Sequence, residues 1–215
     1  MTSPSNPPSS SPLPPAPKRD GEATRQKLHR AALELYTTVG FRGTTTPMIA
    51  ERAGVAEGTI YRHFTGKEHL LNEIYRGAQR WAARQIKDME GDKTLKPAER
   101  LIRFARLLGD AAERDPAVVR MLFYPHDDAH LDEKSRESAR ELAEALQQVV
   151  AMGKSDGIVR PGPAELWASV WFALVEFVAM RICAKEWTAD HPQVSMALEA
   201  AWDAVASKSG GSADT

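Results

Sequence analysis

Apolar residues recur at three- and four-residue steps along most of this chain, and that spacing constrains the fold more than any other feature. Leu28, Ala31 and Leu35 begin one such stripe, and no alternating run of β-branched residues indicates a strand. The chain has 215 residues, 42% of them hydrophobic, which is enough for the cores of one or two domains. We therefore predict an all-α fold.

The two ends of the chain have compositions that do not support a packed core. Residues 1–17 hold seven of the fourteen prolines and five serines, and residues 208–215 are mostly small and polar. Such segments bury too little apolar surface to offset the entropy lost on ordering. We predict disordered tails over residues 1–19 and 208–215.

Charge is divided unevenly between the two halves of the chain. Residues 1–87 carry 13 Lys or Arg against 7 Asp or Glu, whereas residues 88–215 carry 15 against 22. The net charge of -1 argues against general coating of nucleic acid or adhesion to a membrane surface by the whole chain. A cationic front joined to an anionic back indicates two separate tasks.

Several broad classes of protein are disfavoured by features that the sequence lacks. Its one cysteine, Cys183, permits no intramolecular disulfide framework and no site built from several thiolates. Residues 1–17 do not have the pattern of a secretory signal. The apolar segment Leu166–Cys183 is short for a membrane span and includes Glu176 and Arg181. We predict a cytoplasmic protein with no membrane partner.

Helix-end signals divide the front of the chain into short helices. Gly40, followed by an apolar residue, is typical of a left-handed glycine that ends a helix, and Gly54 ends the next helix in the same way. Either Thr45 or Thr46 is expected to cap that second helix. A third short helix, about residues 57–64, follows after a turn of only a few residues.

The third helix is expected to have one buried and one exposed side. Ile60 and Phe64 are four residues apart, so they can pack inward together. A long amphipathic helix then follows, and Thr65 with Glu68 has the spacing of a capping box at its start. Beyond Gly91 the pattern predicts five helices, near Pro97–Arg114, Pro116–Phe123, Asp132–Met152, Pro163–Lys185 and His191–Ser207.

Two short helices joined by a tight turn, after a supporting helix, have the dimensions of a helix-turn-helix. In such a motif the second short helix enters the major groove of DNA. The polar side chains of residues 59 and 61–63 are then free to face the groove and its phosphates. Helix N-termini favour phosphate, and Thr45, Thr46 and Lys67 stand at such positions.

The stretch from Gly40 to Glu68, GFRGTTTPMIAERAGVAEGTIYRHFTGKE, closely resembles the DNA-binding region of the TetR/AcrR family of bacterial transcriptional regulators. The resemblance extends over roughly Arg25–Ile74. It implies an N-terminal three-helix DNA-binding domain, here residues 20–66, and a helical ligand-binding and dimerisation domain, here residues 67–207. It also implies a homodimer that binds a palindromic double-stranded operator, usually as a repressor, and leaves it when a small apolar effector binds.

The resemblance assigns roles to individual residues of the motif. Thr45, Thr59, Tyr61 and Lys67 would hold phosphates, and Gly58, Arg62 and His63 would lie near the groove. Arg62 is the leading candidate for reading a guanine edge, although it could equally anchor the backbone. The full predicted DNA-binding set is Thr45, Thr46, Glu57, Gly58, Thr59, Tyr61, Arg62, His63 and Lys67.

Two positions depart from the family pattern. Ala56 stands where a serine often caps the recognition helix, so a capping interaction of about 1 kcal/mol is expected to be missing. Glu57 brings a carboxylate close to phosphates, where it could instead favour the helix N-terminus or accept from a cytosine amine. Both departures leave the operator sequence open.

The helix predicted over Pro163–Lys185 is apolar nearly all round, so it needs two apolar neighbours. One can be the core of its own chain and the other a second subunit, with the last two helices forming the homodimer interface. Large apolar side chains on the middle helices are candidates for an effector pocket, the alternative being plain core or dimer contacts. They are Met121, Phe123, Tyr124, Trp167, Trp171, Phe172 and Met180.

The sequence gives less support to metal binding or catalysis. The segment His126–Asp132 has residue types that bind zinc, but its proline neighbour and acidic run favour a solvated loop, and we predict no metal and no cofactor. No nucleophile elbow, glycine-rich phosphate loop or His-Glu-x-x-His helix is found, so we predict no enzyme. An all-helical protein-interaction module, or an enzyme that does not bind DNA, is the alternative function.

Overall fold

The computed structural model describes residues 18–92, 94–125 and 129–207, and within them the regular elements are helices. The predicted tails, apart from Lys18 and Arg19, lie outside the described residues. The elements are α1 (Lys18–Thr38), α2 (Thr46–Ala53), the 3-10 turn η1 (Glu57–Thr59), α3 (Ile60–His63), α4 (Lys67–Asp88), the 3-10 turn η2 (Met89–Gly91), α5 (Pro97–Arg114), α6 (Pro116–Leu122), α7 (Glu133–Ser155), α8 (Ala164–Cys183) and α9 (Pro192–Val205).

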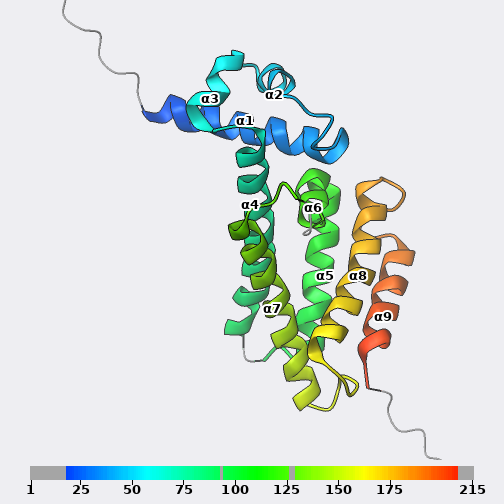
Figure 1. Ribbon diagram of the computed structural model, residues 1–215. Coiled ribbons are helices and arrows are strands. Elements are labelled where there is room, and N and C mark those ends of the chain that lie inside the picture. The colour runs from blue at the N-terminus through cyan, green and yellow to red at the C-terminus, as the bar shows by residue number, and fades with distance from the viewer. Residues whose placement is uncertain (1–17, 93, 126–128, 208–215) are drawn as a thin grey trace, which may run out of the picture.

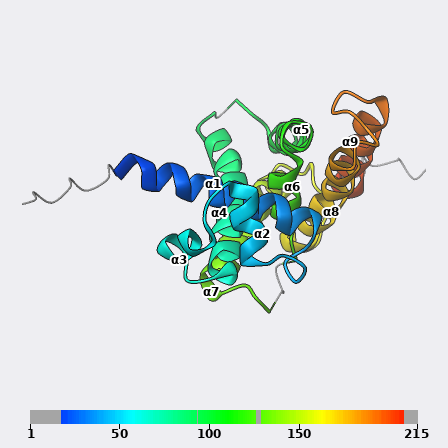
Figure 2. The ribbon, with the colours of Figure 1, turned by 90° about the horizontal axis from the view of Figure 1, so that it is seen from above.

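The helices form two groups that meet at the start of α4. In Figure 1, α1, α2 and α3 lie across the upper end of α4, while α4, α5, α7, α8 and α9 run side by side below them. Figure 2 shows the same molecule from above, with α1 and α2 over α4, α3 beside them, and α8 and α9 at the opposite side from α3. The all-α fold and its N-terminal helix-turn-helix are therefore confirmed.

The small group of helices is held by buried apolar side chains that are continuous with the core of the bundle. Leu28 and Ala32 of α1 pack with Ile49 of α2 and with Ile60 and Phe64 at the two ends of α3. All five are 2% exposed or less. Because the helices are short, this shared burial holds them together where helix propensity alone would not.

Contacts between the groups are both apolar and polar. Helix α1 packs against α6 and against the first turns of α4. The Tyr36 hydroxyl donates to the carbonyl oxygen of Lys67 at 2.8 Å, and Arg30 is paired with Asp115 at 2.5 Å. The α1–α3 group is thus attached to the bundle at the start of α4 and at the α5–α6 corner.

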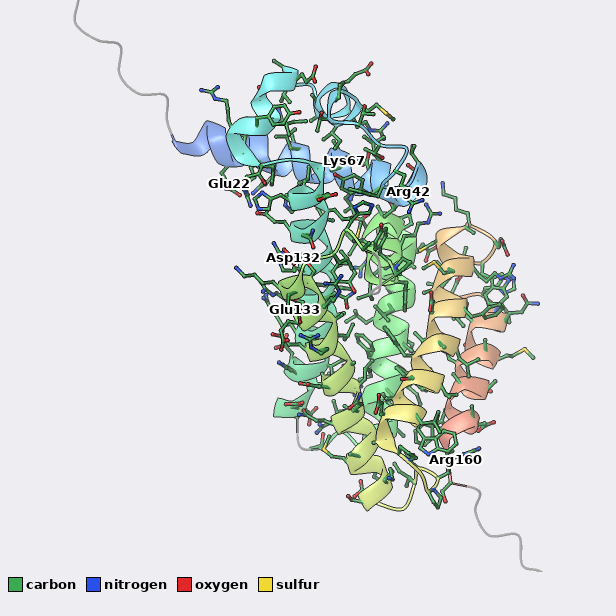
Figure 3. All side chains as sticks on the ribbon, viewed as in Figure 1. Glu22, Arg42, Lys67, Asp132, Glu133 and Arg160 are labelled. Carbon is green, nitrogen blue, oxygen red and sulfur yellow. The ribbon has the colours of Figure 1, made fainter. Side chains whose placement is uncertain are left out.

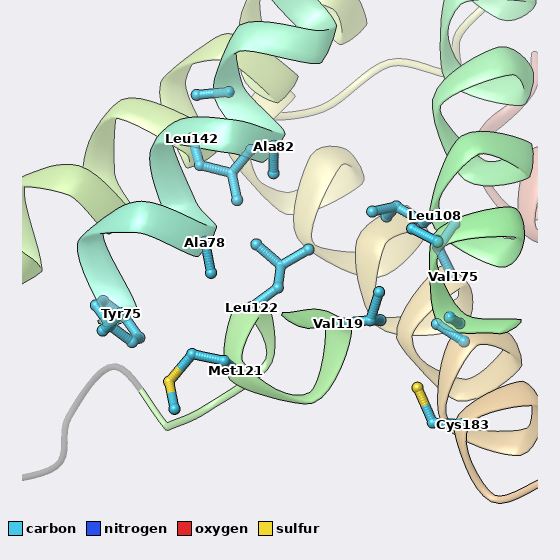
Figure 4. Packing of buried hydrophobic residues seen from close by; sticks show 14 of the residues in the cluster. Tyr75, Ala78, Ala82, Leu108, Val119, Met121, Leu122, Leu142, Val175 and Cys183 are labelled. Atoms are coloured by element: carbon cyan, nitrogen blue, oxygen red, sulfur yellow. The ribbon is translucent and has the colours of Figure 1, made fainter. Parts of the chain in front are cut away.

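The bundle core is built from small and branched apolar side chains on facing helices. Figure 4 shows Leu142 of α7 beside Ala82 of α4, and Leu122 of α6 near Ala78 one turn away on α4. Alanines on α4 allow α7 to approach closely, and α4 with α7 forms the most extensive helix pair of the bundle.

Helix α8 has one buried and one uncovered apolar face. Trp171, Val175 and Ile182 are buried against the bundle, whereas Leu166 and Phe177 are 48% and 47% exposed. By length and composition α8 resembles a membrane span, but it packs along α5, α7 and α9 as part of the bundle. The uncovered face is the second apolar surface that the sequence predicted for this helix.

Most predicted helix ends agree with the structure to within three residues. Gly40 and Gly54 have φ of 87° and 68°, which confirms both left-handed glycines, and α5 has the predicted bounds. Helix α7 continues through Gly153 to Ser155 instead of ending at Met152. Close packing explains this glycine, which is not a helix end, because a Cβ on Gly153 would lie 2.8 Å from the Val159 side chain.

The predicted capping box at the start of α4 is wrong. Gly66 is the N-cap, and no side chain caps the helix there. The Glu68 carboxylate instead lies 2.9 Å from Nδ1 of His130, and the Thr65 N–H donates to His69. A tertiary partner 62 residues away has displaced the local interaction that the spacing indicated.

Candidate nucleic-acid interface and internal cavity

The segment formed by η1 and α3, residues 57–63, has the two-sided character that its sequence predicts. Ile60 is fully buried beneath it, and Phe64 follows as a second buried anchor. On the outer side Tyr61 is 59% exposed and Arg62 is also exposed, while Thr59 and His63 are half-buried. We call residues 57–63 the recognition segment.

The anchor below the recognition segment is an aromatic cluster. The ring of Phe64 lies 5.7 Å from that of His29 and 5.9 Å from that of His69, between centroids. The guanidinium of Arg25 lies over the same ring at 4.8 Å. Contacts from both α1 and α4 therefore determine where the recognition segment sits.

The start of α2 is joined to the recognition segment by a hydroxyl pair. The Thr45 side chain caps α2 by accepting from the Met48 N–H at 3.4 Å, which settles which threonine is the cap. The Thr46 hydroxyl lies 3.3 Å from the Tyr61 hydroxyl. Three hydroxyl groups therefore lie at one end of α2, beside the recognition segment, where they can donate to phosphate oxygens.

Lys67 is held more firmly than its place at a helix N-terminus indicates. Its Nζ donates to the carbonyl oxygens of Phe41 at 3.1 Å and Thr44 at 2.9 Å, and it lies over the Phe41 ring. An ammonium group has three donors, so one is left for another acceptor. Figure 3 shows Lys67 where the α1–α3 group joins α4.

Three neighbouring residues at the start of the recognition segment are open to an outside partner. A Cβ built on Gly58 would meet no atom within 4 Å, so packing within the chain does not require glycine here. Glu57 is exposed in the first turn, and Ala56 is the N-cap without a side-chain hydrogen bond, as predicted.

Arginines in this part of the chain differ in whether they have partners. Arg25 is paired with Glu73, and Arg52 donates to Glu34 at 2.6 Å. Within the described residues, no hydrogen bond or ion pair engages Arg62. An exposed guanidinium without an internal partner is available to bind phosphate or a guanine edge.

Polar contacts from α1 and α4 meet at the carboxylate of Glu73 on α4. Its carboxylate is paired with Arg25 and lies 3.2 Å from His29 and 3.1 Å from His69. Burial raises the pKa of Glu73, but hydrogen bonds from Arg25 and His29 outweigh that effect and hold the pKa below its ordinary value. The cluster lies in an open hollow of about 620 Å³ between the two helices.

A more enclosed cavity of about 480 Å³ lies between α4, α6, α7 and α8. Its walls combine apolar, aromatic and charged side chains, and its volume is within the usual range of small-molecule pockets, about 300–1,000 Å³. The lining residues that carry the later argument are Tyr75, Phe123, Arg136, Arg140, Phe172 and Glu176.

Of the residues predicted to line an effector pocket, Phe123 and Phe172 do line this cavity, with ring centroids 5.0 Å apart. Trp171 and Met121 are instead fully buried in the core, and the Trp167 indole donates to the Pro161 carbonyl. Tyr124 and Met180 pack against the core outside the cavity wall. The charged and amide residues of the wall were missed, because large apolar side chains were the only signal used.

The wall formed by α7 is attached to α4 by a buried amide. Asn72 is 4% exposed, and its Nδ2 donates to the carbonyl oxygen of His130 at 2.8 Å. Its Oδ1 accepts from the Asp132 N–H at 2.7 Å and from the Ser135 hydroxyl at 2.6 Å. Figure 3 shows Asp132 and the start of α7 beside α4.

The remaining candidates contribute no further site. His126, Asp127 and Asp128, which include most of the predicted metal-ligand types, lie outside the described residues, and elsewhere no three such side chains cluster. Cys183 is a small buried side chain, and burial raises the pKa of its thiol.

Comparison with known families gives two matches along the chain. Residues 28–74 match the profile described as bacterial regulatory proteins, tetR family. Residues 99–207 match the tetracyclin repressor-like C-terminal domain, so the second match alone covers half of the chain.

Individual relatives agree with these matches. The HTH-type transcriptional repressor KstR2 of Mycobacterium tuberculosis H37Rv is 28% identical over 145 residues, which is 64% of this chain and 70% of that protein.

Solved structures share the fold. A TetR family transcription regulator from Marinobacter aquaeolei VT8 has a TM-score of 0.74 at 21% identity, covering 89% of this chain and all of that one. FadR of Bacillus subtilis, solved with stearoyl-CoA, has a TM-score of 0.65 at 18% identity, covering 82% and 97%. The chain belongs to the TetR family and is a DNA-binding transcriptional regulator.

Proposed function

We propose that this regulator binds a palindromic operator as a homodimer, with one recognition segment in the major groove of each half-site. The observation that carries the proposal is the form of residues 57–63, in which Ile60 is buried while Tyr61 and Arg62 face outward. A two-fold dimer presents two such segments, which suits half-sites about 34 Å apart.

The residues of the interface fall into two groups. The hydroxyls of Thr45, Thr46, Thr59 and Tyr61, with the remaining donor of Lys67, bind phosphates and set the register on the duplex. Glu57, Gly58, Arg62 and His63 lie against the base edges, where Arg62 reads a guanine and Glu57 accepts from a cytosine amine. The pairing of Thr46 with Tyr61 supports a common phosphate site for those two hydroxyls.

Repression with release by a small molecule is the mode of regulation that we propose. The cavity between α4, α6, α7 and α8 supports it, because an effector there would contact the helix that carries the DNA-binding helices. KstR2 is named as a repressor, and the FadR structure contains stearoyl-CoA. By linkage, the effector must bind the DNA-free form more tightly than the operator-bound form.

The wider organisation follows from this function. Residues 20–66 act as the DNA-binding domain and residues 67–207 as the effector-binding and dimerisation domain, with α8 and α9 forming the dimer contact. The exposed Leu166, Leu174 and Phe177 on α8 support that contact. The protein works in the cytoplasm and catalyses no reaction.

A mobility-shift experiment with the DNA upstream of the gene that encodes this chain tests the proposal. We expect a retarded complex for the wild-type dimer, and weaker binding for Arg62→Ala. Arg84→Ala, which removes an exposed arginine far along α4, is the control and should bind as the wild type does. No complex even at low salt would favour a protein-interaction module or an enzyme instead.

A further inference from the structure

The cavity between α4, α6, α7 and α8 has two charged walls that differ in how their charges are paired. On α7, Arg140 is paired with Glu133 at 2.7 Å and with Glu137. Arg136 lies 3.9 Å from Glu133. The positive charges of this wall are therefore balanced by carboxylates of their own helix.

The carboxylates on the α8 wall are not paired with positively charged side chains in this way. Glu165 and Glu176 both line the cavity, and among the described residues neither forms a hydrogen bond or an ion pair. Glu176 is half-buried, and burial raises the pKa of its carboxyl. An ionised carboxylate that loses water without gaining a partner is costly, and a bound cation removes that cost.

Aromatic rings lie on the same cavity. Tyr75 of α4, Phe123 of the α6 end and Phe172 of α8 all line it, and Phe172 is one helical turn from Glu176. The faces of aromatic rings attract ammonium groups, and the attraction is stronger where water is excluded. Unpaired carboxylates with aromatic rings form a combination that suits an organic cation.

Other side chains that line the cavity are apolar and can pack against the hydrocarbon part of a ligand. Leu122, Leu142, Leu146 and Ala168 contribute apolar surface between the polar groups. A ligand that fills the cavity must therefore be largely apolar, with its polar group confined to one part.

We propose that the cavity binds an apolar molecule that carries a protonated amine, with the ammonium beside Glu176 and the hydrocarbon against Leu142, Leu146 and Phe172. This inference rests on the proposed effector role of the cavity and specifies the class of effector. An anionic head group would have to displace Glu133 from the α7 arginines and would leave Glu176 unpaired.

Isothermal titration calorimetry on the full-length dimer tests the preference with three probes of equal chain length. Dodecylamine, dodecanol and dodecanoate are titrated at pH 7 below their micelle concentrations, where the amine is protonated. We expect dodecylamine to bind at least about tenfold more tightly than either of the others. Glu176→Gln should remove most of this advantage and leave the dodecanol affinity unchanged, whereas Glu176→Asp, which keeps the charge, should retain part of it.

Glu144→Gln is the matched control, because Glu144 is exposed on α7 and does not line the cavity. Its amine affinity should equal that of the wild type. The inference is overturned if dodecanoate binds most tightly, if no probe binds, or if the amine preference survives in Glu176→Gln. Operator binding is measured on the same preparations, so loss of DNA binding would count against the proposed function without altering the probe ranking.

Discussion

At the scale of single residues, Gly58 and Tyr75 are unusual because neither is explained by packing within the chain. Gly58 has open space where a side chain would be, and the Tyr75 hydroxyl is buried without a hydrogen-bond partner. Natural chains keep such features where a partner or ligand uses them, or tolerate them at a cost in stability. Substitutions at these two positions therefore distinguish effects on the stability of the fold from effects on the binding of DNA or ligand.

Gly58→Ala should leave the fold intact and weaken operator binding. Alanine has the higher helix propensity, so the free energy of unfolding should stay level or rise by up to about 1 kcal/mol. The added methyl group would lie between the backbone and the base edges, and we expect about a tenfold loss of affinity. Urea denaturation and mobility shift measure the two effects. Unchanged affinity would mean that the backbone does not approach DNA at this position.

Tyr75→Phe should stabilise the ligand-free protein. Burial raises the pKa of Tyr75 to about 12, in keeping with a hydroxyl held in apolar surroundings. Leaving such a group unpaired costs about 1–3 kcal/mol, and phenylalanine fills almost the same space. Urea denaturation should show a gain of about 1 kcal/mol. A loss of stability would show that the hydroxyl has a partner in solution, such as a bound water.

At the scale of elements, the contact between α4 and the start of α7 depends on Asn72. Replacing Asn72 by alanine removes the hydrogen bonds that its amide, which is 4% exposed, makes with the Asp132 N–H and with the buried Ser135 hydroxyl. We expect a loss of about 2–4 kcal/mol in the free energy of unfolding. Gln148→Ala, at an exposed amide on α7, should change it by less than about 0.5 kcal/mol. Equal losses for the two variants in urea denaturation would contradict the role of Asn72.

Local signals predicted the elements well where short-range physics decides them. Gly54 ends α2 because a left-handed residue is required there, and Pro97 begins α5 because proline suits a first helical turn. Local signals failed at Glu68, whose partner is distant in sequence, and at Gly153, where close packing of Val159 explains the glycine and no helix end does. The cavity was predictable only in part, because periodicity does not show which helices leave space between them.

At the scale of the whole molecule, three carboxylates join different pairs of helices. Glu34 joins α1 to α2 through Arg52, Glu73 joins α1 to α4, and Asp132 joins α7 to α4 through Arg76. The pKa of each lies below its ordinary value. Hydrogen bonds from Arg52 and Arg30 lower the pKa of Glu34, and for Glu73 and Asp132 hydrogen bonds outweigh the effect of burial.

Lowering the pH should therefore weaken all three of these contacts between helices and lower the stability of the fold. A carboxylate whose folded pKa is depressed contributes stability above its unfolded pKa, which is 4.5 for Glu73, and loses it as pH falls through the folded value. Thermal unfolding of Glu73→Gln should differ most from wild type above that pH, and the difference should shrink as the solution is acidified. A difference that grows in acid would contradict a lowered pKa for the folded Glu73 carboxyl.

The uncovered apolar face of α8 leads us to predict where the two subunits of the homodimer meet. Phe177→Glu places a charge within an apolar surface that a second subunit would cover, so we expect the dimer to dissociate at micromolar concentration. Met152→Glu makes the same change at an exposed residue at the end of α7 and should leave the dimer intact. Sedimentation velocity distinguishes the two outcomes. A dimer that persists in Phe177→Glu would place the interface elsewhere.

The DNA-binding helices are attached to the first turn of α4, so a tilt of α4 moves them. Its 22 residues span about 33 Å, so a tilt of about 6° about its far end moves the first turn by about 3.5 Å. Two subunits tilting in opposite directions change the separation of their recognition segments by about 7 Å, a fifth of the distance between successive major grooves on one side of DNA. A molecule as small as the cavity can therefore put both segments out of register with the operator while every helix stays folded.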